Sequence, residues 1–244
     1  MFKKCCISLL LFILTFAGIT FGNNNVNAEE VQNDNIYFNY EEAVSKGIIS
    51  PADYTKAEWD NFQTNQKQAF QSGIDTQNQD EFVSYSRKVV LPVRGLRAGD
   101  IIVTNNGGYG VTGHAAIMLN SHTVLHISGF GAYPKTLEFN TFKRNYLKKR
   151  GHWIHVYGSP SKDKGLKAAA WAKKTYANKT NIKYGMSPAL GTINPTYCSK
   201  IVYQAYYSGV GKTSVYKPNS NLPIEPYKLN TYIKGSGIIQ LYTK

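Results

Sequence analysis

The chain has 244 residues, with 28 lysines and arginines against 15 aspartates and glutamates, and a formal net charge of +13. This length accommodates one sizeable domain with an extension. The positive charge favours anionic surroundings, namely teichoic acids, anionic lipid headgroups or nucleic acid. No nucleic-acid-binding motif is present, so we expect no nucleic-acid partner and a solvated basic surface suited to anionic cell-surface polymers.

The first 28 residues have the pattern of a secretory leader. Lys3 and Lys4 precede an apolar run from Ile7 to Phe21, and residues 26–28 offer a small-residue cleavage site. The apolar run is too short for a convincing transmembrane span. We therefore expect a signal peptide over residues 1–28 and a product that is secreted or associated with the cell wall.

Residues 29–87 are predicted to form a polar, helical N-terminal extension. Ser50 and Pro51 indicate a helix start, with the serine as N-cap and the proline in the first turn. Apolar residues then recur at roughly helical spacing, at Trp59, Phe62, Ala69 and Phe70. We expect one or two amphipathic helices that pack on the main domain or cover its cleft.

Residues 88–244 are predicted to form an α+β domain. Short β-type runs are expected at Val89–Val93, Ile101–Val103, His114–Leu119, Thr123–Ile127, Trp153–Tyr157 and Gly237–Tyr242. Two helices are expected between the last strands: Leu166–Tyr176, which Ser161 opens, and Cys198–Ser208, which Gly209 ends as a C-terminal glycine. This order predicts a mainly antiparallel sheet packed against helices.

Cys198 is the one cysteine that remains when the leader, which contains Cys5 and Cys6, is removed. A lone thiol in an exported protein is a liability unless it has a task. Its predicted place at a helix N-terminus, near an imidazole, would lower the thiol pKa and favour the thiolate nucleophile. The alternative is a small buried core residue, because Ile201, Val202 and Ala205 share its helix face.

His114 and His126 are the candidate partners of this thiol. They are twelve residues apart, and a hairpin that closes around Asn120 sets them directly opposite each other with their Cβ atoms roughly 5 Å apart. One imidazole could then accept the thiol proton while the other orients it. A two-residue turn at residues 121–122 would instead place His126 opposite Ile117.

The other three histidines are weaker candidates. His122 is expected at the solvated hairpin tip, and His152 and His155 flank a later strand. His122 and His126 are four residues apart, which on a strand separates them by about 13 Å. No carboxylate or second cysteine lies close in sequence to complete a zinc site. We expect no metal and no cofactor.

Three motifs carry a resemblance to a known family: Gly99–Ile102, Gly113–Met118 and Tyr197–Val202. Over roughly Val93 to Tyr242, the chain resembles the circularly permuted NlpC-type, papain-like cysteine hydrolases of the YiiX/YebB-like group. In unpermuted relatives the cysteine precedes the histidine, whereas here the histidine comes first, as permutation requires. The resemblance implies a permuted papain-like fold.

The same resemblance implies roles for individual residues. Cys198 would attack a carbonyl carbon, His114 would act as base and then as acid, and the helix-start amide of Cys198 would help to hold the oxyanion. Tyr184, which matches a family tyrosine, and Tyr197 would be substrate-binding residues.

Two positions depart from the family pattern. His126 stands where the YiiX-like group often has a glutamate, which is similar to the His-His-Cys pattern of the lecithin retinol acyltransferase-like relatives. Glu138 is the alternative residue to orient His114. Gly185 follows Tyr184 where an acidic residue is common in the family.

These residues support three hypotheses about function. The first is an exported cysteine hydrolase that cleaves amide bonds, in cell-wall peptides, through an acyl-thioenzyme at Cys198. The second is a lipid acylhydrolase or acyltransferase with the same three residues. The third is a secreted binding protein with a vestigial site, in which the N-terminal extension is the adhesive module.

Overall fold

The computed structural model describes residues 38–75, 94–107, 113–218 and 221–244. Residues 33–244 form one compact unit. The predicted leader, residues 1–28, and the first predicted strand, Val89–Val93, lie outside the described residues.

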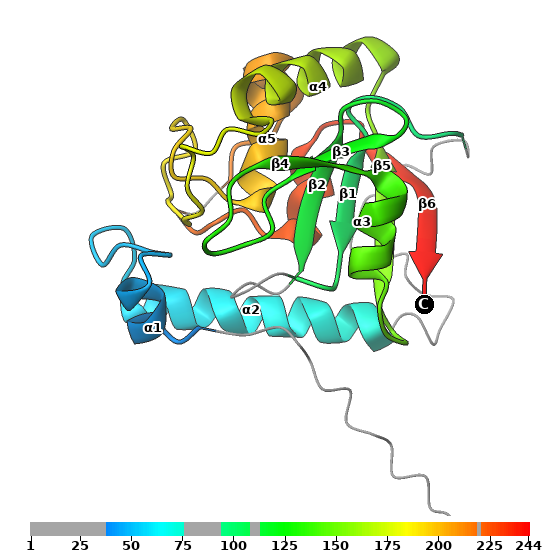
Figure 1. Cartoon of the computed structure of the whole chain (residues 1–244). Helices are drawn as coiled ribbons and strands as arrows, with labels where there is room; N and C mark the ends of the chain where they lie inside the picture. The colour runs from blue at the N-terminus through cyan, green and yellow to red at the C-terminus, as the bar shows by residue number, and fades with distance from the viewer. Residues whose placement is uncertain (1–37, 76–93, 108–112, 219–220) are drawn as a thin grey trace, which may run out of the picture. The chain divides into compact units, whose positions relative to one another are not determined.

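A six-stranded antiparallel sheet forms the centre of this unit (Figure 1). Its strand order is β4-β3-β2-β1-β5-β6, and each hydrogen-bonded pair is antiparallel. The strands are β1 (Ile101–Thr104), β2 (His114–Met118), β3 (Thr123–His126), β4 (Lys135–Glu138), β5 (Trp153–Gly158) and β6 (Gly237–Thr243). The α+β class predicted from the sequence is therefore confirmed.

Helices cover both faces of the sheet. They are α1 (Tyr40–Ser45), α2 (Lys56–Asp75), α3 (Phe139–Tyr146), α4 (Lys162–Tyr176), α5 (Cys198–Gly209) and α6 (Leu229–Tyr232). One core cluster joins Phe142 of α3 to Met118 of β2, and the other joins α4 and α5 to Ile117. Because neither face meets water, every residue of β1, β2 and β5 is buried, which explains their continuous apolar runs.

The N-terminal helices share the core with the sheet. Trp59 and Phe62 are fully buried in the same cluster as the helix α5, and the Trp59 indole donates to the Phe38 carbonyl at 3.0 Å. The main-chain N–H of Met186 donates to the carbonyl of Ile48 at 2.6 Å. The described part of the extension therefore packs on the main domain, as predicted; the exact domain boundaries stay predictions.

The helix predicted to start at Ser50 and Pro51 in fact begins at Lys56. Thr55 and Glu58 form a capping box, in which each side chain accepts a hydrogen bond from the other's main-chain N–H at 3.3 and 2.8 Å. Ser50 instead closes a turn, in which its carbonyl accepts from the main-chain N–H groups of Asp53 and Tyr54. The prediction was wrong because Ser50 lacks a glutamate three residues later.

The helix α5 ends at Gly209, as predicted, but Gly209 is its last helical residue and not a cap in the left-handed conformation. The residue that follows the helix is Val210, in a right-handed helical conformation. A Cβ atom at Gly209 would lie 2.7 Å from the Cβ of Trp171 and 3.0 Å from the carbonyl oxygen of Lys167. The glycine therefore permits close packing of α5 against α4.

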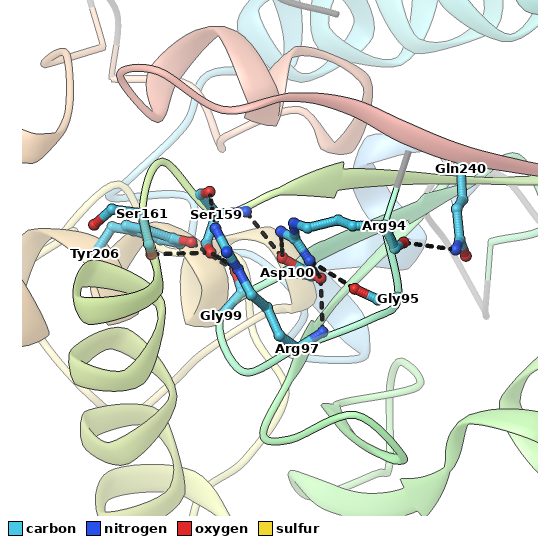
Figure 2. A network of polar contacts seen from close by, with 9 residues as sticks. All are labelled: Arg94, Gly95, Arg97, Gly99, Asp100, Ser159, Ser161, Tyr206 and Gln240. Atoms are coloured by element: carbon cyan, nitrogen blue, oxygen red, sulfur yellow. Dashed lines mark hydrogen bonds and ion pairs between the residues drawn. The ribbon is translucent and has the colours of Figure 1, made fainter. Parts of the chain in front are cut away.

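A buried carboxylate holds the neighbouring ends of β1 and β5 together (Figure 2). Asp100 is fully buried and accepts two hydrogen bonds from the Arg94 guanidinium, at 2.6 and 2.8 Å. The main-chain N–H groups of Arg97 and Ser159 donate to the same carboxylate, each at 2.9 Å. The Asp100 carboxylate therefore has a donor at each of its main acceptor positions. A buried charge is stable only when it is paired and hydrogen-bonded in this way.

Replacement of this carboxylate should be costly. In Asp100→Ala, the Arg94 guanidinium and two buried N–H groups lose their acceptor, so the free energy of unfolding should fall by about 3–5 kcal/mol. Urea denaturation at neutral pH measures the difference. The matched control is Asp163→Ala, which removes an exposed partner of Lys167 and should cost at most about 0.5 kcal/mol. Equal losses in the two variants would contradict a structural role for Asp100.

Candidate active site

Cys198 is the first residue of α5, as predicted, and its side chain is buried, with 4% of its surface exposed. Tyr197, the N-cap, is in an extended conformation and makes no side-chain capping bond. The first N–H groups of the helix are therefore free of a side-chain cap. This geometry directs the positive end of the helix dipole toward the thiol.

Burial raises the pKa of the Cys198 thiol, although the surrounding donors act in the opposite direction. The main-chain N–H groups of Ala115, Ser199 and Cys198 itself lower it, as does the Ser199 side chain. The Ser199 hydroxyl lies 2.5 Å from the carbonyl oxygen of Ile224, and its one proton is donated either to that oxygen or to the thiol. The resting site thus holds a protonated thiol, and the expected lowering of its pKa was wrong because desolvation outweighs the helix start.

His114 and His126 are in direct contact, as the sequence predicted. His114 is the first residue of β2 and His126 the last residue of β3, and each is 2% exposed. The Nε2 atom of His114 lies 3.1 Å from the Nδ1 atom of His126, and the ring centroids are 5.2 Å apart at an interplanar angle of 81°. The Cys198 sulfur faces the main-chain N–H of the residue after His114, which brings the thiol to the same strand end.

The register of the hairpin differs from both alternatives considered for the sequence. Leu125 pairs with Ile117, and continuation of this register places His126 across from Ala116. The two histidines are therefore diagonal neighbours on one face, within reach of each other's rings. The cause is Asn120, whose side-chain oxygen accepts from two main-chain N–H groups at 2.8 Å and closes a three-residue loop.

Glycine at position 113 lets the strand start approach the core closely. Its φ is +77°, and a Cβ atom there would lie 2.7 Å from the Tyr227 ring. A side chain would therefore be strained and would collide with Tyr227. Gly113 fixes where His114 enters the sheet.

Both imidazoles are neutral in this environment. Burial lowers the pKa of His114 well below its ordinary value, and the neighbouring His126 lowers it further. Burial also lowers the pKa of His126, to about 3, with a smaller contribution from Lys135. Two neutral rings share a hydrogen bond only if one donates and the other accepts.

One assignment of the protons leaves His114 competent as a base. If Nε2–H of His114 donates to Nδ1 of His126, then Nδ1 of His114 carries a lone pair that can accept a proton. His126 must then carry its own proton on Nε2, and that atom is buried without a hydrogen-bond partner among the described residues. His126 thereby orients His114 as an acceptor, without taking the proton itself.

Tyr146, at the end of α3, is a site residue that the sequence reasoning missed. Its ring stacks on His114 with centroids 4.9 Å apart and an interplanar angle of 9°, and its hydroxyl lies 3.3 Å from Nδ1 of His126. Burial raises the pKa of Tyr146, and a charge on Cys198 raises it further, so the hydroxyl stays protonated. It and Nε2–H of His114 face the same single lone pair on Nδ1 of His126. The signal that could have found it is the spacing of Phe139, Phe142 and Tyr146, which places three aromatic residues on one face of a helix.

The two predicted substrate-binding tyrosines lie in different surroundings. Tyr184 is paired with Thr196, and its pKa is raised by burial and then by a charge on Cys198, which places it in the field of the thiol. Tyr197 accepts a hydrogen bond from the main-chain N–H of Ile224 at 3.0 Å. Burial also raises the pKa of Tyr197, and a charge on Cys198 raises it further, so both tyrosines lie in the field of the thiol.

The remaining candidates lie elsewhere. Glu138 is exposed and pairs with Thr123, whereas His126 pairs with Lys135, so it is His126 that contacts His114. The exposed His122 is at the hairpin tip, as predicted. Away from the site, His155 is buried in β5 and stacks on a tryptophan, and His152 is half-buried before that strand. Within the described ranges, no group of three histidine, cysteine or acidic side chains could hold a metal ion.

A cysteine at a helix start, beside a strand-borne histidine with a polar partner, is the arrangement of papain-like enzymes. Residues 69–236 match the family described as "Lipoprotein N-acylation protein LnsA-like", and the chain belongs to this family. It is a family of the papain-like and lecithin retinol acyltransferase-like type, which indicates an enzyme of acyltransferase or hydrolase function.

The chain is also similar to an "Uncharacterized 30.3 kDa protein" of Bacillus thuringiensis. The two are 34% identical over 142 residues, which is 55% of this chain and 52% of the relative, so the chain spans about half the length of that relative. No solved structure matches the chain. In the described parts of the chain, no helix is both long and apolar enough to cross a membrane.

The buried neutral histidines should make the protein less stable in acid. In the unfolded chain, His126 is protonated below its ordinary pKa of 6.5, whereas in the folded chain it is protonated only near pH 3. The contribution of neutral His126 to the free energy of unfolding is therefore fully present above pH 6.5 and is lost as the pH falls from 6.5 toward 3. His126→Asn should reduce the pH dependence of the free energy of unfolding in this range by about 1.4 kcal/mol per pH unit. Urea denaturation from pH 7 to pH 4 measures it. The exposed His122→Asn is the control; a slope unchanged in His126→Asn would contradict burial of a neutral ring.

Proposed function

We propose that this protein is an exported cysteine acyltransferase. It takes a fatty acyl group from a lipid ester onto Cys198 and passes it to an amine, for which the family description points to the N-terminus of a lipoprotein. The observation that carries the proposal is the 3.1 Å contact between two neutral, buried histidines at the strand end that faces the Cys198 thiol.

The first half-reaction forms a thioester. Nδ1 of His114 takes the thiol proton as the sulfur attacks the ester carbonyl carbon, and His126 holds the ring by accepting from Nε2–H. The main-chain N–H of Cys198 stabilises the developing oxyanion. The carbonyl re-forms, the carbon–oxygen bond of the ester breaks, and His114 returns the proton to the leaving alcohol. The products are an acyl-thioenzyme and a deacylated lipid.

The second half-reaction transfers the acyl group. The acceptor amine attacks the thioester carbonyl carbon while His114 takes one of its protons. The carbon–sulfur bond then breaks, an amide forms, and His114 returns the proton to the Cys198 sulfur. No oxidant, reductant or metal is needed. Water in place of the amine would give hydrolysis to the free fatty acid.

Three features support a lipid acyl group over a cell-wall peptide. The site is surrounded by buried aromatic side chains, among them Phe142 and Tyr146 of α3, which stack on His114 and meet His126 edge to face. The orienting residue is a neutral histidine, as in the lecithin retinol acyltransferase-like pattern. The matched family is described by N-acylation. The permuted order of His114 and Cys198 supports an NlpC-type ancestry, and the predicted leader supports action outside the cytoplasm.

Trapping of the acyl-thioenzyme tests the proposal. The purified chain, mixed with phosphatidylglycerol in detergent micelles, should gain one fatty acyl group on Cys198 that neutral hydroxylamine removes. Intact-mass spectrometry measures the adduct. Cys198→Ala should show none, and circular dichroism should show that its fold is intact, because loss of one small side chain costs little.

The histidine variants separate the roles in this reaction. His114→Ala should slow acylation by about 100-fold or more, because general base catalysis is lost. His126→Ala should slow it less, since His126 orients the base, and the exposed His122→Ala should leave it unchanged. Acylation that is indifferent to His114, or cleavage of a muropeptide amide with no lipid adduct, would contradict the proposal.

A further inference from the structure

Two loops that lead directly from the catalytic residues carry exposed apolar side chains. Residues 127–134 follow His126, and residues 187–195 precede the helix that begins with Cys198. Among the described residues, six large hydrophobic side chains are exposed, and half of them are on these two loops. They are Phe130, Tyr133 and Ile193, each 41% or 42% exposed.

The first loop, and the residue just before the second, contact the N-terminal segment. The ammonium group of Lys46, which ends α1, lies 5.8 Å from the centroid of the Phe130 ring. Immediately before the other loop, the main-chain N–H of Met186 donates to the carbonyl of Ile48, two residues after Lys46. Contacts from the first loop and from the residue that precedes the second therefore converge on the short stretch that follows α1.

The surroundings of the loops are basic. No acidic residue occurs in residues 126–137 or 164–224. Exposed Lys183 donates from its main chain to Asn194, next to Ile193, and exposed Lys179 follows Asn178, which is bonded to the start of β4.

The nearby acidic residues of α1 are already engaged. Glu41 lies 3.5 Å from the Lys56 ammonium group, and Glu42 accepts from the main-chain N–H of Asn39 in the cap of its own helix. The basic character of the loops is therefore not cancelled by free carboxylates at α1.

We propose that this surface, called here the loop face, docks on an anionic lipid bilayer. The loop face consists of Phe130, Tyr133, Ile193, Lys46, Lys179 and Lys183. The inference rests on the proposed function: a chain that takes its acyl group from a membrane lipid must bring its site close to the bilayer.

The chemistry of the loop face favours a bilayer over a soluble polyanion. Aromatic and aliphatic side chains insert at the boundary between headgroups and acyl chains, while lysines bind anionic headgroups. A teichoic acid or another polyanion would contact the lysines alone and would give the three apolar side chains no partner. Dependence of binding on Phe130, Tyr133 and Ile193 is therefore the property that distinguishes a bilayer.

Vesicle co-sedimentation of the full-length chain tests the proposal. Binding should be stronger to vesicles of phosphatidylglycerol and phosphatidylcholine than to pure phosphatidylcholine, and should weaken with salt. The triple variant F130S/Y133S/I193S should lose about tenfold or more in affinity. A second variant, K46Q/K179Q/K183Q, should lose binding to the anionic vesicles at physiological salt.

The chain provides matched controls for both variants. L166S/Y216S/L241S replaces the other three exposed apolar side chains, which are 51–58% exposed and lie away from the two loops. K167Q/K173Q/K174Q removes three exposed lysines of α4. Both controls should bind within about twofold of the unmodified chain. Equal losses in loop-face and control variants would overturn the proposal, as would tight binding to teichoic acid with none to vesicles.

A soluble substrate separates this inference from the proposed function. The loop-face variants should acylate Cys198 from a short-chain 4-nitrophenyl ester at the rate of the unmodified chain, since none of the six residues belongs to the catalytic site. Vesicle binding without acylation would support the docking proposal and contradict the proposed acyltransferase function. Normal acylation from micellar lipid, with vesicle binding unchanged in F130S/Y133S/I193S, would contradict the loop face alone.

Discussion

The hydrogen bond between His114 and His126 is the interaction on which the site depends, because burial keeps both rings neutral. In water, an imidazole exchanges between its two tautomers. Here each ring carries one proton, and the hydrogen bond between the rings determines which nitrogen carries it. The geometry requires three supports: a three-residue hairpin loop closed by Asn120, a glycine at 113, and α3, whose Tyr146 stacks on one ring and bonds to the other. Each of these three supports acts by positioning the two histidines.

Burial also determines how the nucleophile is made. A resting thiolate and imidazolium would be two charges in an apolar site, and burial opposes both, raising the pKa of Cys198 and lowering that of His114. In the proposed reaction, the proton therefore moves as the sulfur attacks, and charge develops on the substrate oxygen beside the helix start. The same dry, aromatic surroundings suit an acyl chain, so the feature that disfavours a free thiolate favours a lipid substrate.

The sequence predicted the sheet, α5 and the histidine pair because these depend on local patterns: short apolar runs, a lone cysteine, an even spacing on a hairpin. It did not predict features that depend on tertiary contacts. The hairpin register followed from the Asn120 side chain, the function of Gly209 from the approach of α4, and the role of Tyr146 from the packing of α3. The sign of the Cys198 pKa shift was missed because a helix start is visible in a sequence, whereas complete desolvation is not.

The tautomers of the two histidines test this account most directly. Nitrogen-15 NMR at neutral pH, with assignment by comparison with His114→Ala and His126→Ala, distinguishes protonated from unprotonated ring nitrogens. We predict Nε2–H on both rings, with Nδ1 of His114 free to accept the thiol proton and Nδ1 of His126 as the acceptor between the rings. A proton on Nδ1 of His114, or a doubly protonated ring at neutral pH, would contradict the relay from Cys198 to His114.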